Sequence, residues 1–225
     1  MTVKLAHIGL GKCGSVFLNR IFKEIEKETN IKLINLYDFV DTKKTHVLQD
    51  LTNLEKVLPN NFIISHRTLF SKGWEFNQIY KSFELNKKNF SKQVTILIVL
   101  RNPYELLNSI YIQKIMQMEI IEPNKFFFIE KNNLYQNKKG FNLSQFNYKF
   151  LISLYKTYFK KVKVVKYEDL HKFSYLKELF AVEDDFLEYL NTKKENTFNP
   201  SISKLGVNFF LFLNRFVNLE KNQNS

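Results

Sequence analysis

A short stretch near the start of the chain combines residue types that bind anions. Residues 9–15 read Gly-Leu-Gly-Lys-Cys-Gly-Ser and hold three of the six glycines in the chain. A strand-like apolar segment precedes them and a helix-like pattern follows. A glycine turn that opens a helix directs backbone N–H groups and the positive end of the helix dipole at an anion. Lys12 adds a full positive charge, so the sequence predicts a turn that holds a phosphate-like group.

The same glycine spacing fits a second kind of site. The three glycines follow the G-x-G-x-x-G pattern of dinucleotide-binding turns, and Asp38 lies roughly where the ribose-binding acid of such sites is found, about 20 residues on. An NAD(P)-dependent oxidoreductase with a Rossmann turn is therefore an open alternative. Its turn does not need a lysine, however, and few strand–helix units follow residue 120. The Walker pattern G-x-x-x-x-G-K-[ST] does not fit, because Lys12 precedes the last glycine.

A second polar cluster follows the most strand-like segment of the chain. Residues 94–100 form an unbroken apolar and β-branched run, which is typical of a central parallel strand covered on both faces. Arg101 comes directly after this run, and Ser109 lies about two turns down the next helix. Ligands of open parallel sheets bind at the carboxyl ends of the strands. An arginine fork and a hydroxyl there would suit a second phosphate.

The elements that must position these residues alternate between strand and helix, as in α/β folds. The sequence predicts strands over residues 3–9, 31–37, 62–66, 94–100 and 162–167. It predicts helices over residues 14–28, 48–58, 74–86 and 147–158, and another that begins at Asn102-Pro103 with Glu105 at a capping-box position. Residues 126–140 are expected to form a long loop. The predicted fold class is α/β, an open parallel sheet flanked by helices, in one domain over residues 1–225 with a helical C-terminal segment at about 200–220.

Composition narrows the classes of function. The chain has 225 residues, a net charge of +12 and 44% hydrophobic residues, enough for one domain with a buried core. The charge favours an anionic partner, but no nucleic-acid-binding motif is recognisable. One cysteine and four scattered histidines predict neither a disulfide nor a metal site. Without a signal segment or an apolar run of ~20 residues, a soluble cytoplasmic protein without a transmembrane segment is expected.

Three segments together resemble one protein family. Residues 7–16 look like the 5′-phosphosulfate loop of sulfotransferases that use PAPS (3′-phosphoadenosine 5′-phosphosulfate), usually Pro-Lys-x-Gly-Thr-Thr. Arg101 with Ser109 is similar to the family's 3′-phosphate motif, and residues 165–170 resemble its late strand ending in Tyr-Glu-Asp-Leu. The order and approximate spacing also agree. Gly11 stands in place of the proline, and Val16 lacks the second hydroxyl.

The resemblance implies a P-loop-like sulfotransferase fold and transfer of a sulfuryl group from PAPS to a hydroxyl or amine of a glycan, lipid or small molecule, releasing PAP. Lys12 would neutralise charge that develops on the bridging oxygen. Arg101 and Ser109 would hold the 3′-phosphate, and no metal is required. The residues implied at the 5′-phosphate are those of the turn, namely Gly11, Lys12, Cys13, Gly14, Ser15 and Val16.

The chemistry also needs a base to take the acceptor's proton. His66, expected at the carboxyl end of the third strand, is the candidate because the intrinsic pKa of histidine suits proton transfer. A structural His66 is the alternative, and Arg67 stands where some bacterial relatives carry an acid. Cys13 as a nucleophile is disfavoured, since no histidine is placed beside it by local sequence. A non-catalytic nucleotide- or polyanion-binding domain is the third reading of the chain.

The apolar stretch at residues 205–217 is too short to cross a bilayer. We expect it to be a helix that covers the core. Contact with a membrane surface is the alternative, and it would suit a lipid or lipid-linked glycan acceptor. The sequence does not identify the acceptor or the oligomeric state.

Overall fold

The computed structural model describes residues 2–36, 54–66, 69–70, 79–117, 123–129 and 141–192. They fall into two compact units. The first runs to Arg101 and resumes at Asn147, and the second includes Asn102–Phe146. The first unit holds the main sheet and the glycine turn, so it is the unit that positions the predicted site.

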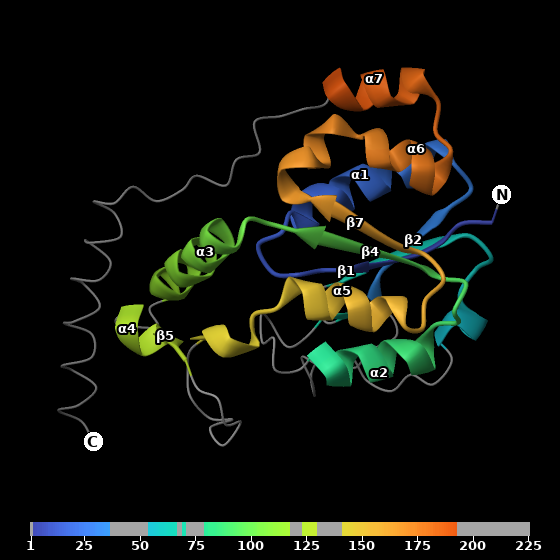
Figure 1. Cartoon of the computed structure of the whole chain (residues 1–225). Helices are drawn as coiled ribbons and strands as arrows, with labels where there is room; N and C mark the ends of the chain where they lie inside the picture. The colour runs from blue at the N-terminus through green and yellow to red at the C-terminus, as the bar shows by residue number, and fades with distance from the viewer. Residues whose placement is uncertain are drawn as a thin grey trace, which may run out of the picture. The chain divides into compact units, whose positions relative to one another are not determined.

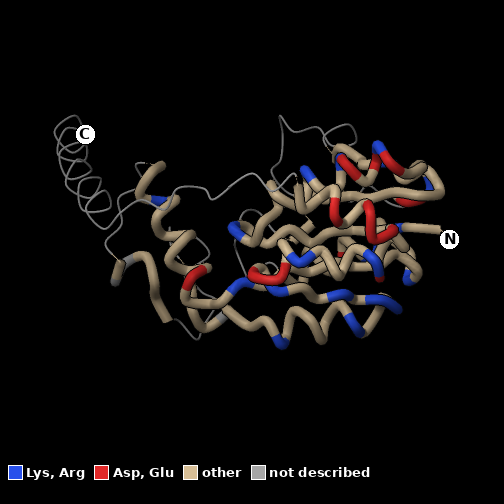
Figure 2. The backbone as a smooth tube through the Cα atoms, turned by 90° about the horizontal axis from the view of Figure 1, so that it is seen from above, with Lys and Arg blue, Asp and Glu red and all other residues tan. Residues whose placement is uncertain are grey.

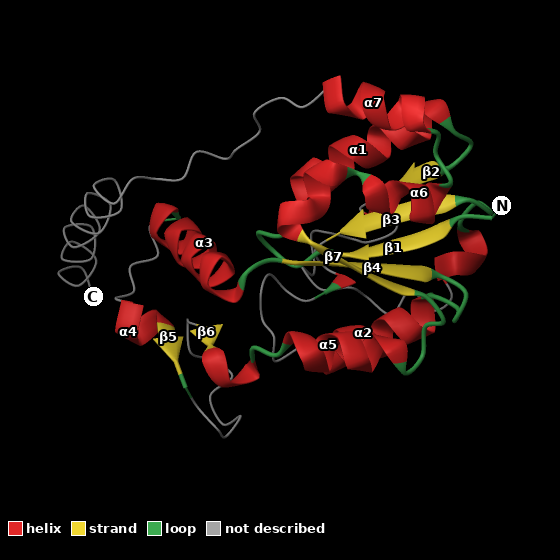
Figure 3. Ribbon diagram, turned by 45° about the horizontal axis from the view of Figure 1, so that its top comes forward, coloured by secondary structure: helices red, strands yellow, loops and turns green. Residues whose placement is uncertain are grey.

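The first unit is built on one sheet of five parallel strands in the order β2-β3-β1-β4-β7. Figures 1 and 3 show these strands side by side with helices on both faces. The α/β class and the open parallel sheet are therefore confirmed. The strand bounds are β1 Lys4–Ile8, β2 Lys32–Ile34, β3 Phe62–His66, β4 Thr95–Leu100 and β7 Val162–Lys166.

The helices of the first unit cover the sheet in two layers. In Figures 1 and 3, α1 (Ser15–Glu28), α6 (Ser174–Phe180) and α7 (Asp184–Thr192) lie on one face. The opposite face carries α2 (Ile79–Asn89) and α5 (Tyr148–Lys156). A five-stranded parallel sheet has two apolar faces, and this arrangement buries both of them.

Strand β4 confirms the expectation of a central, doubly covered strand. It pairs with β1 on one side and β7 on the other, and its four inner residues, Ile96 to Val99, are fully buried. Their apolar side chains alternate between the two faces, so each helical layer packs against part of this strand. The strand therefore delivers Arg101 to a fixed place at the sheet edge.

Asparagine caps fix two of the helix starts that the sequence predicts. The Asn102 side chain accepts hydrogen bonds from the backbone N–H groups of Tyr104 and Glu105, with Pro103 as the first helical residue of α3 (Pro103–Met116). The Asn147 side chain accepts from the backbone N–H of Phe150 and begins α5. Beyond α3, the described part of the second unit holds the following short elements: α4 (Pro123–Phe126), β5 (Phe127–Phe128), β6 (Phe141–Asn142) and a 3₁₀ turn at Leu143–Gln145.

Several predicted elements differ from the structure. The second strand is only Lys32–Ile34, and within the predicted helix 48–58 the described residues form a 3₁₀ turn at Leu54–Val57. The loop predicted from residue 126 is wrong at its start, because Phe127–Phe128 pairs with Phe141–Asn142 in a small parallel sheet. This pairing joins segments that are distant in sequence, so local composition did not reveal it. The C-terminal segment at 200–220 lies outside the described residues.

Among the residues that the structure describes, no helix is long and apolar enough to span a membrane. Lysines and arginines, blue in Figure 2, are spread over many parts of the first unit. Charge alone therefore does not single out one surface as the site.

Candidate functional site

The sheet topology has its switch point between the carboxyl ends of β1 and β4. These two strands are neighbours, but the chain leaves β1 toward β2 on one side and leaves β4 toward β7 on the other. Ligands of open α/β sheets bind at such a switch point, outside the carboxyl ends of the strands. The glycine turn follows β1 and Arg101 follows β4, so both predicted anion-binding features of the first unit meet there.

The turn is folded by its own backbone and leaves donors for a ligand. The backbone N–H of Cys13 donates to the carbonyl of Leu10 over 3.2 Å, and the first bond of α1 runs from the N–H of Leu18 to the carbonyl of Gly14 over 2.9 Å. The N–H groups of the residues between, 15–17, therefore have no acceptor within the helix. No side chain caps this helix start. The helix start thus has the form of an anion-binding end.

Position 14 requires a glycine, both because of its backbone conformation and because two neighbouring side chains leave no room for a Cβ. Its φ of +80° lies in the left-handed region, and an added Cβ would stand 2.6 Å from Cδ1 of Leu170 and 3.2 Å from Cε2 of Tyr167. Both neighbours belong to the 3₁₀ segment Tyr167–Lys172 that follows β7. Lys12 also has a positive φ, +65°, which is uncommon for a residue with a side chain.

Arg101 joins the turn to three other elements. Its Nη1 donates to the carbonyl oxygen of Lys12 over 3.3 Å, and its guanidinium lies over the ring of Tyr167, 4.7 Å from the ring centre. Its own carbonyl accepts a 2.9 Å hydrogen bond from the hydroxyl of Tyr148, the first residue of α5. The ends of β1, β4 and β7 and the start of α5 therefore converge on this arginine.

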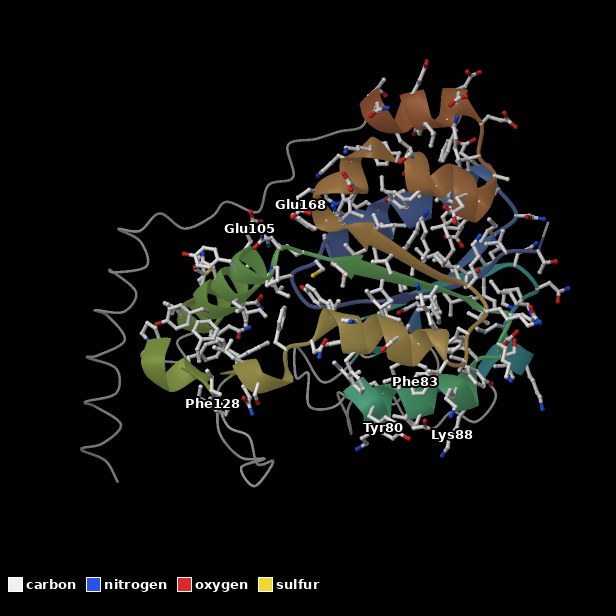
Figure 4. The ribbon with its side chains drawn as sticks, in the orientation of Figure 1. Tyr80, Phe83, Lys88, Glu105, Phe128 and Glu168 are labelled. Carbon is white, nitrogen blue, oxygen red and sulfur yellow. The ribbon has the colours of Figure 1, made fainter. Side chains whose placement is uncertain are left out.

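The turn is electropositive and partly desolvated. Burial, and secondly the nearby Arg101 charge, lower the pKa of Lys12 from its ordinary value. Cys13 is fully buried, and burial raises the pKa of its thiol to about 12 despite the opposing influence of Arg101. The thiol stays protonated at neutral pH, which removes it as a nucleophile. Glu168, labelled in Figure 4, follows Tyr167 and adds an exposed acid close enough to contribute to the Cys13 shift.

Ser15 and Val16 are the first two residues of α1, and their side chains differ in burial and polarity. The Ser15 hydroxyl oxygen is buried and makes no hydrogen bond. A buried hydroxyl without a partner is costly, and a phosphate oxygen at the helix start would satisfy it. The Val16 side chain is 68% exposed and offers no polar atom. At these two positions, only Ser15 and the backbone can therefore donate to a ligand.

Two histidines lie near this edge in different settings. His66 ends β3, and its Cα pairs in register with Ile8, directly before the turn. The structure therefore brings His66 to the predicted edge, one strand away from the turn. His7 is fully buried within β1, where its Nδ1 lies 2.8 Å from the Ser65 hydroxyl. Burial lowers the pKa of His7 to about 3, so it is a neutral core residue.

Some of the predicted site residues are not placed beside the turn. Ser109 lies on α3 and is partly exposed, and α3 belongs to the second unit. Asp38 and Arg67 lie outside the described residues. The structure therefore gathers the turn residues 11–16, Arg101 and His66 in the first unit.

Sequence reasoning missed how Tyr148, Tyr167 and Leu170 contribute. The segment Tyr-Glu-Asp-Leu was noted only as a family likeness, whereas the structure packs Tyr167 and Leu170 against Gly14. The signal available in the sequence was positional, because Tyr167 is the last residue of the strand predicted over 162–167 and thus reaches the same end of the sheet. Tyr148 carried no comparable signal.

A cavity of about 430 Å³ lies near the amino ends of the strands, away from the glycine turn. It is lined by Lys4, Glu55, Lys56, Lys87, Lys88, Asn89, Phe90, Ser91 and Tyr158. Two of its lysines form ion pairs: Lys4 pairs with Glu55 over 2.7 Å and Lys87 with Glu84 over 3.1 Å. Lys88, labelled in Figure 4, lies in the last turn of α2, where a cation favours the helix dipole. The C-terminal end of α2 carries the negative end of the helix dipole, which disfavours an anion here, so this cavity is not the candidate site.

Within the described part of the chain, no group of three or more His, Cys, Asp or Glu side chains could hold a metal ion. Comparison with known proteins found no matching family model, no matching curated protein and no matching solved structure.

Proposed function

We propose that this protein is a sulfotransferase that moves a sulfuryl group from PAPS to a hydroxyl or amine of a glycan, lipid or small-molecule acceptor and releases PAP. The observation that carries the proposal is the position of Lys12. It lies inside the glycine turn that precedes α1, at the switch point of the sheet, and Arg101 contacts its carbonyl. On this proposal the finer fold class is the P-loop-like sulfotransferase fold.

The residues of the turn suit the 5′ end of such a donor. The donor supplies an activated sulfuryl group, and the protein supplies position and charge. The N–H groups of the first turn of α1 and the unpaired Ser15 hydroxyl can hold phosphate oxygens. The Lys12 ammonium would stabilise negative charge on the leaving phosphate. Arg101 and Ser109 are proposed to hold the 3′-phosphate, which distinguishes PAPS from ATP.

His66 remains the proposed base. It ends the strand next to β1 at the same edge as the turn. A base there would take the proton of the acceptor as the new bond forms. The acceptor class is left broad, and the positive net charge of the protein favours an acidic glycan or a lipid at an anionic surface. A cytoplasmic location is part of the proposal.

The strand order argues against the dinucleotide alternative. The Rossmann order 3-2-1-4-5-6 places the second strand beside the first, so that the acid after it reaches the ribose. In this sheet β3 lies between β1 and β2. The end of β2 is therefore two strand spacings from β1, about 9–10 Å, instead of one. The glycine pattern alone does not overcome this difference.

Calorimetry with PAP, NADH and ATP tests the proposal. We expect PAP to bind in preference to ATP, and NADH not to bind. Binding of NADH without PAP would contradict the proposal, and PAP binding without transfer to any of a broad acceptor panel would favour a non-catalytic nucleotide-binding domain.

Two variants distinguish the role of Lys12 from that of Arg101. Lys12→Ala should lower transfer by about 10²–10³-fold while PAP affinity changes much less, because its charge acts mainly in the transition state. Arg101→Ala should weaken PAP binding by roughly 10- to 100-fold, since it removes charge-assisted hydrogen bonds. Lys23→Ala, on an exposed position of α1, is the matched control and should change neither. Equal effects of Lys12→Ala and Arg101→Ala on both quantities would contradict these separate roles.

A further inference from the structure

We propose that Tyr167 is a positioning residue of the anion-binding turn, and that it acts through the face and edge of its ring. Its edge packs on Gly14, and its face carries Arg101, which in turn holds the carbonyl of Lys12. The inference depends on the proposed function only in naming the reaction in which the turn takes part. The contacts themselves are within the first unit.

The first contact sets the shape of the helix start. Two ring atoms of Tyr167, Cε2 and Cδ2, lie 3.2 and 3.3 Å from where a Cβ on Gly14 would stand. The ring therefore occupies the space beside the bare backbone, directly before the first N–H groups of α1. Because β7 pairs with β4, with Lys166 opposite Leu100, Tyr167 emerges beside Arg101. The register of the sheet thus brings the ring to both partners.

The second contact orients Arg101. Its guanidinium lies 4.7 Å from the centre of the Tyr167 ring, within the range of a cation–π interaction. A planar guanidinium on a ring face has a restricted orientation, which reduces the freedom of a long side chain. From this position Nη1 donates to the Lys12 carbonyl. The hydroxyl of Tyr148 holds the backbone of Arg101 at the same time.

Together the two contacts maintain the backbone conformation of Lys12. Its φ of +65° is unfavourable for a residue with a Cβ, so surrounding contacts must maintain it. The bond from Arg101 to its carbonyl is such a contact. Removal of the Tyr167 ring would leave Arg101 less restrained, and the turn could relax toward a more ordinary backbone. The Lys12 ammonium would then lie farther from the Arg101 charge.

The ring, and not the hydroxyl, is the part that acts. Tyr167→Phe keeps both contacts, whereas Tyr167→Leu keeps much of the volume but removes the aromatic face. Tyr189→Leu, on α7, is a matched control that removes a tyrosine whose hydroxyl lies 3.0 Å from Glu24. Thermal unfolding of each variant shows whether it is folded before binding is compared.

The test measures two properties. The first is the pKa of Lys12 in the ligand-free protein, from NMR titration of the reductively ¹³C-methylated lysines, with Lys12→Arg to assign the signal. The second is the affinity for inorganic pyrophosphate. Tyr167→Leu should move the Lys12 pKa toward its ordinary value, since part of the shift comes from Arg101. It should also weaken pyrophosphate binding about 3- to 10-fold, while Tyr167→Phe and Tyr189→Leu resemble the wild type.

An unchanged Lys12 pKa and unchanged pyrophosphate affinity in Tyr167→Leu would overturn the inference. Equal losses in Tyr167→Phe and Tyr167→Leu would overturn it too, because they would assign the effect to the hydroxyl. If Tyr167→Leu does not fold, Arg101→Lys is the second test. It keeps the charge but loses the planar stack, and the inference requires it to change the Lys12 titration. Failure of the wild type to bind PAP would refute the proposed function and leave this titration test intact.

Discussion

Substitution of Gly14 by alanine tests the geometry of the turn most directly. The φ of Gly14, +80°, is unfavourable for any residue with a Cβ, at a cost of about 1–2 kcal/mol. The new methyl group would stand 2.6 Å from Cδ1 of Leu170, so the end of that side chain must move, at about 0.5–1.5 kcal/mol for a displaced rotamer. Reduced freedom of the unfolded chain opposes these costs by about 0.4–1 kcal/mol.

Together these effects predict that Gly14→Ala lowers the free energy of unfolding by about 2 kcal/mol. For a chain of this size that corresponds to a decrease in Tm of about 4–8 °C. Urea denaturation gives the free energy, and an unchanged m-value would show that the folded and unfolded states keep their compactness. Gly11→Ala is the control, since the φ of Gly11 is not in the left-handed region.

A double-mutant cycle with Leu170→Val isolates the steric part. Valine lacks the Cδ1 atom that the new methyl group would approach, so Gly14→Ala should cost less in that background, with a coupling of about 0.5–1.5 kcal/mol. A Gly14→Ala protein within about 0.5 kcal/mol of the wild type would refute the reasoning. So would a cost as small as that of Gly11→Ala.

Two further predictions concern the core. His7 takes up a proton near pH 6.5 in the unfolded chain but only near pH 3 in the folded chain, so the free energy of unfolding should fall as the pH drops below 6.5, by roughly 3 kcal/mol at pH 4.5. Urea denaturation at pH 7 and pH 4.5 should show a smaller fall for His7→Leu than for the wild type. Equal falls would contradict the assignment of this pH dependence to His7. Tyr155→Phe removes the hydroxyl that accepts a 2.7 Å bond from buried Asn86, and it should cost about 1–3 kcal/mol in urea denaturation without changing pyrophosphate affinity. A loss of affinity there would show that the core and the turn are coupled.

Local sequence was sufficient where local physics decides the structure. The apolar run at 94–100 became β4, and Asn102 with Pro103 began α3, because strand burial and helix capping depend on adjacent residues. The glycine turn was predicted for the same reason. Strand β2 was shorter than its apolar pattern suggested.

The order of the strands could not be predicted in this way. Whether β3 or β2 lies beside β1 depends on how crossover connections pack on the two faces of the sheet, and no local pattern records it. That order distinguishes this sheet from a Rossmann fold, although the glycine pattern is shared. The contact from Arg101 to the Lys12 carbonyl likewise needs β1 and β4 to be neighbours. The sequence therefore indicated which elements carry the candidate residues, but not the contacts between them.

Gly11 stands where the sulfotransferases that the sequence resembles usually have a proline, and these contacts show how the turn can be restrained without one. A proline in the turn would fix one φ locally, and glycine leaves that freedom open. In this chain the restraint comes from outside the turn: Arg101 holds the Lys12 carbonyl, and Tyr167 and Leu170 close on Gly14. A turn held by neighbouring strands can keep its shape without the proline. Gly11→Pro should therefore add less rigidity here than in a turn that lacks such neighbours, because its shape is already maintained by β4 and by the segment after β7.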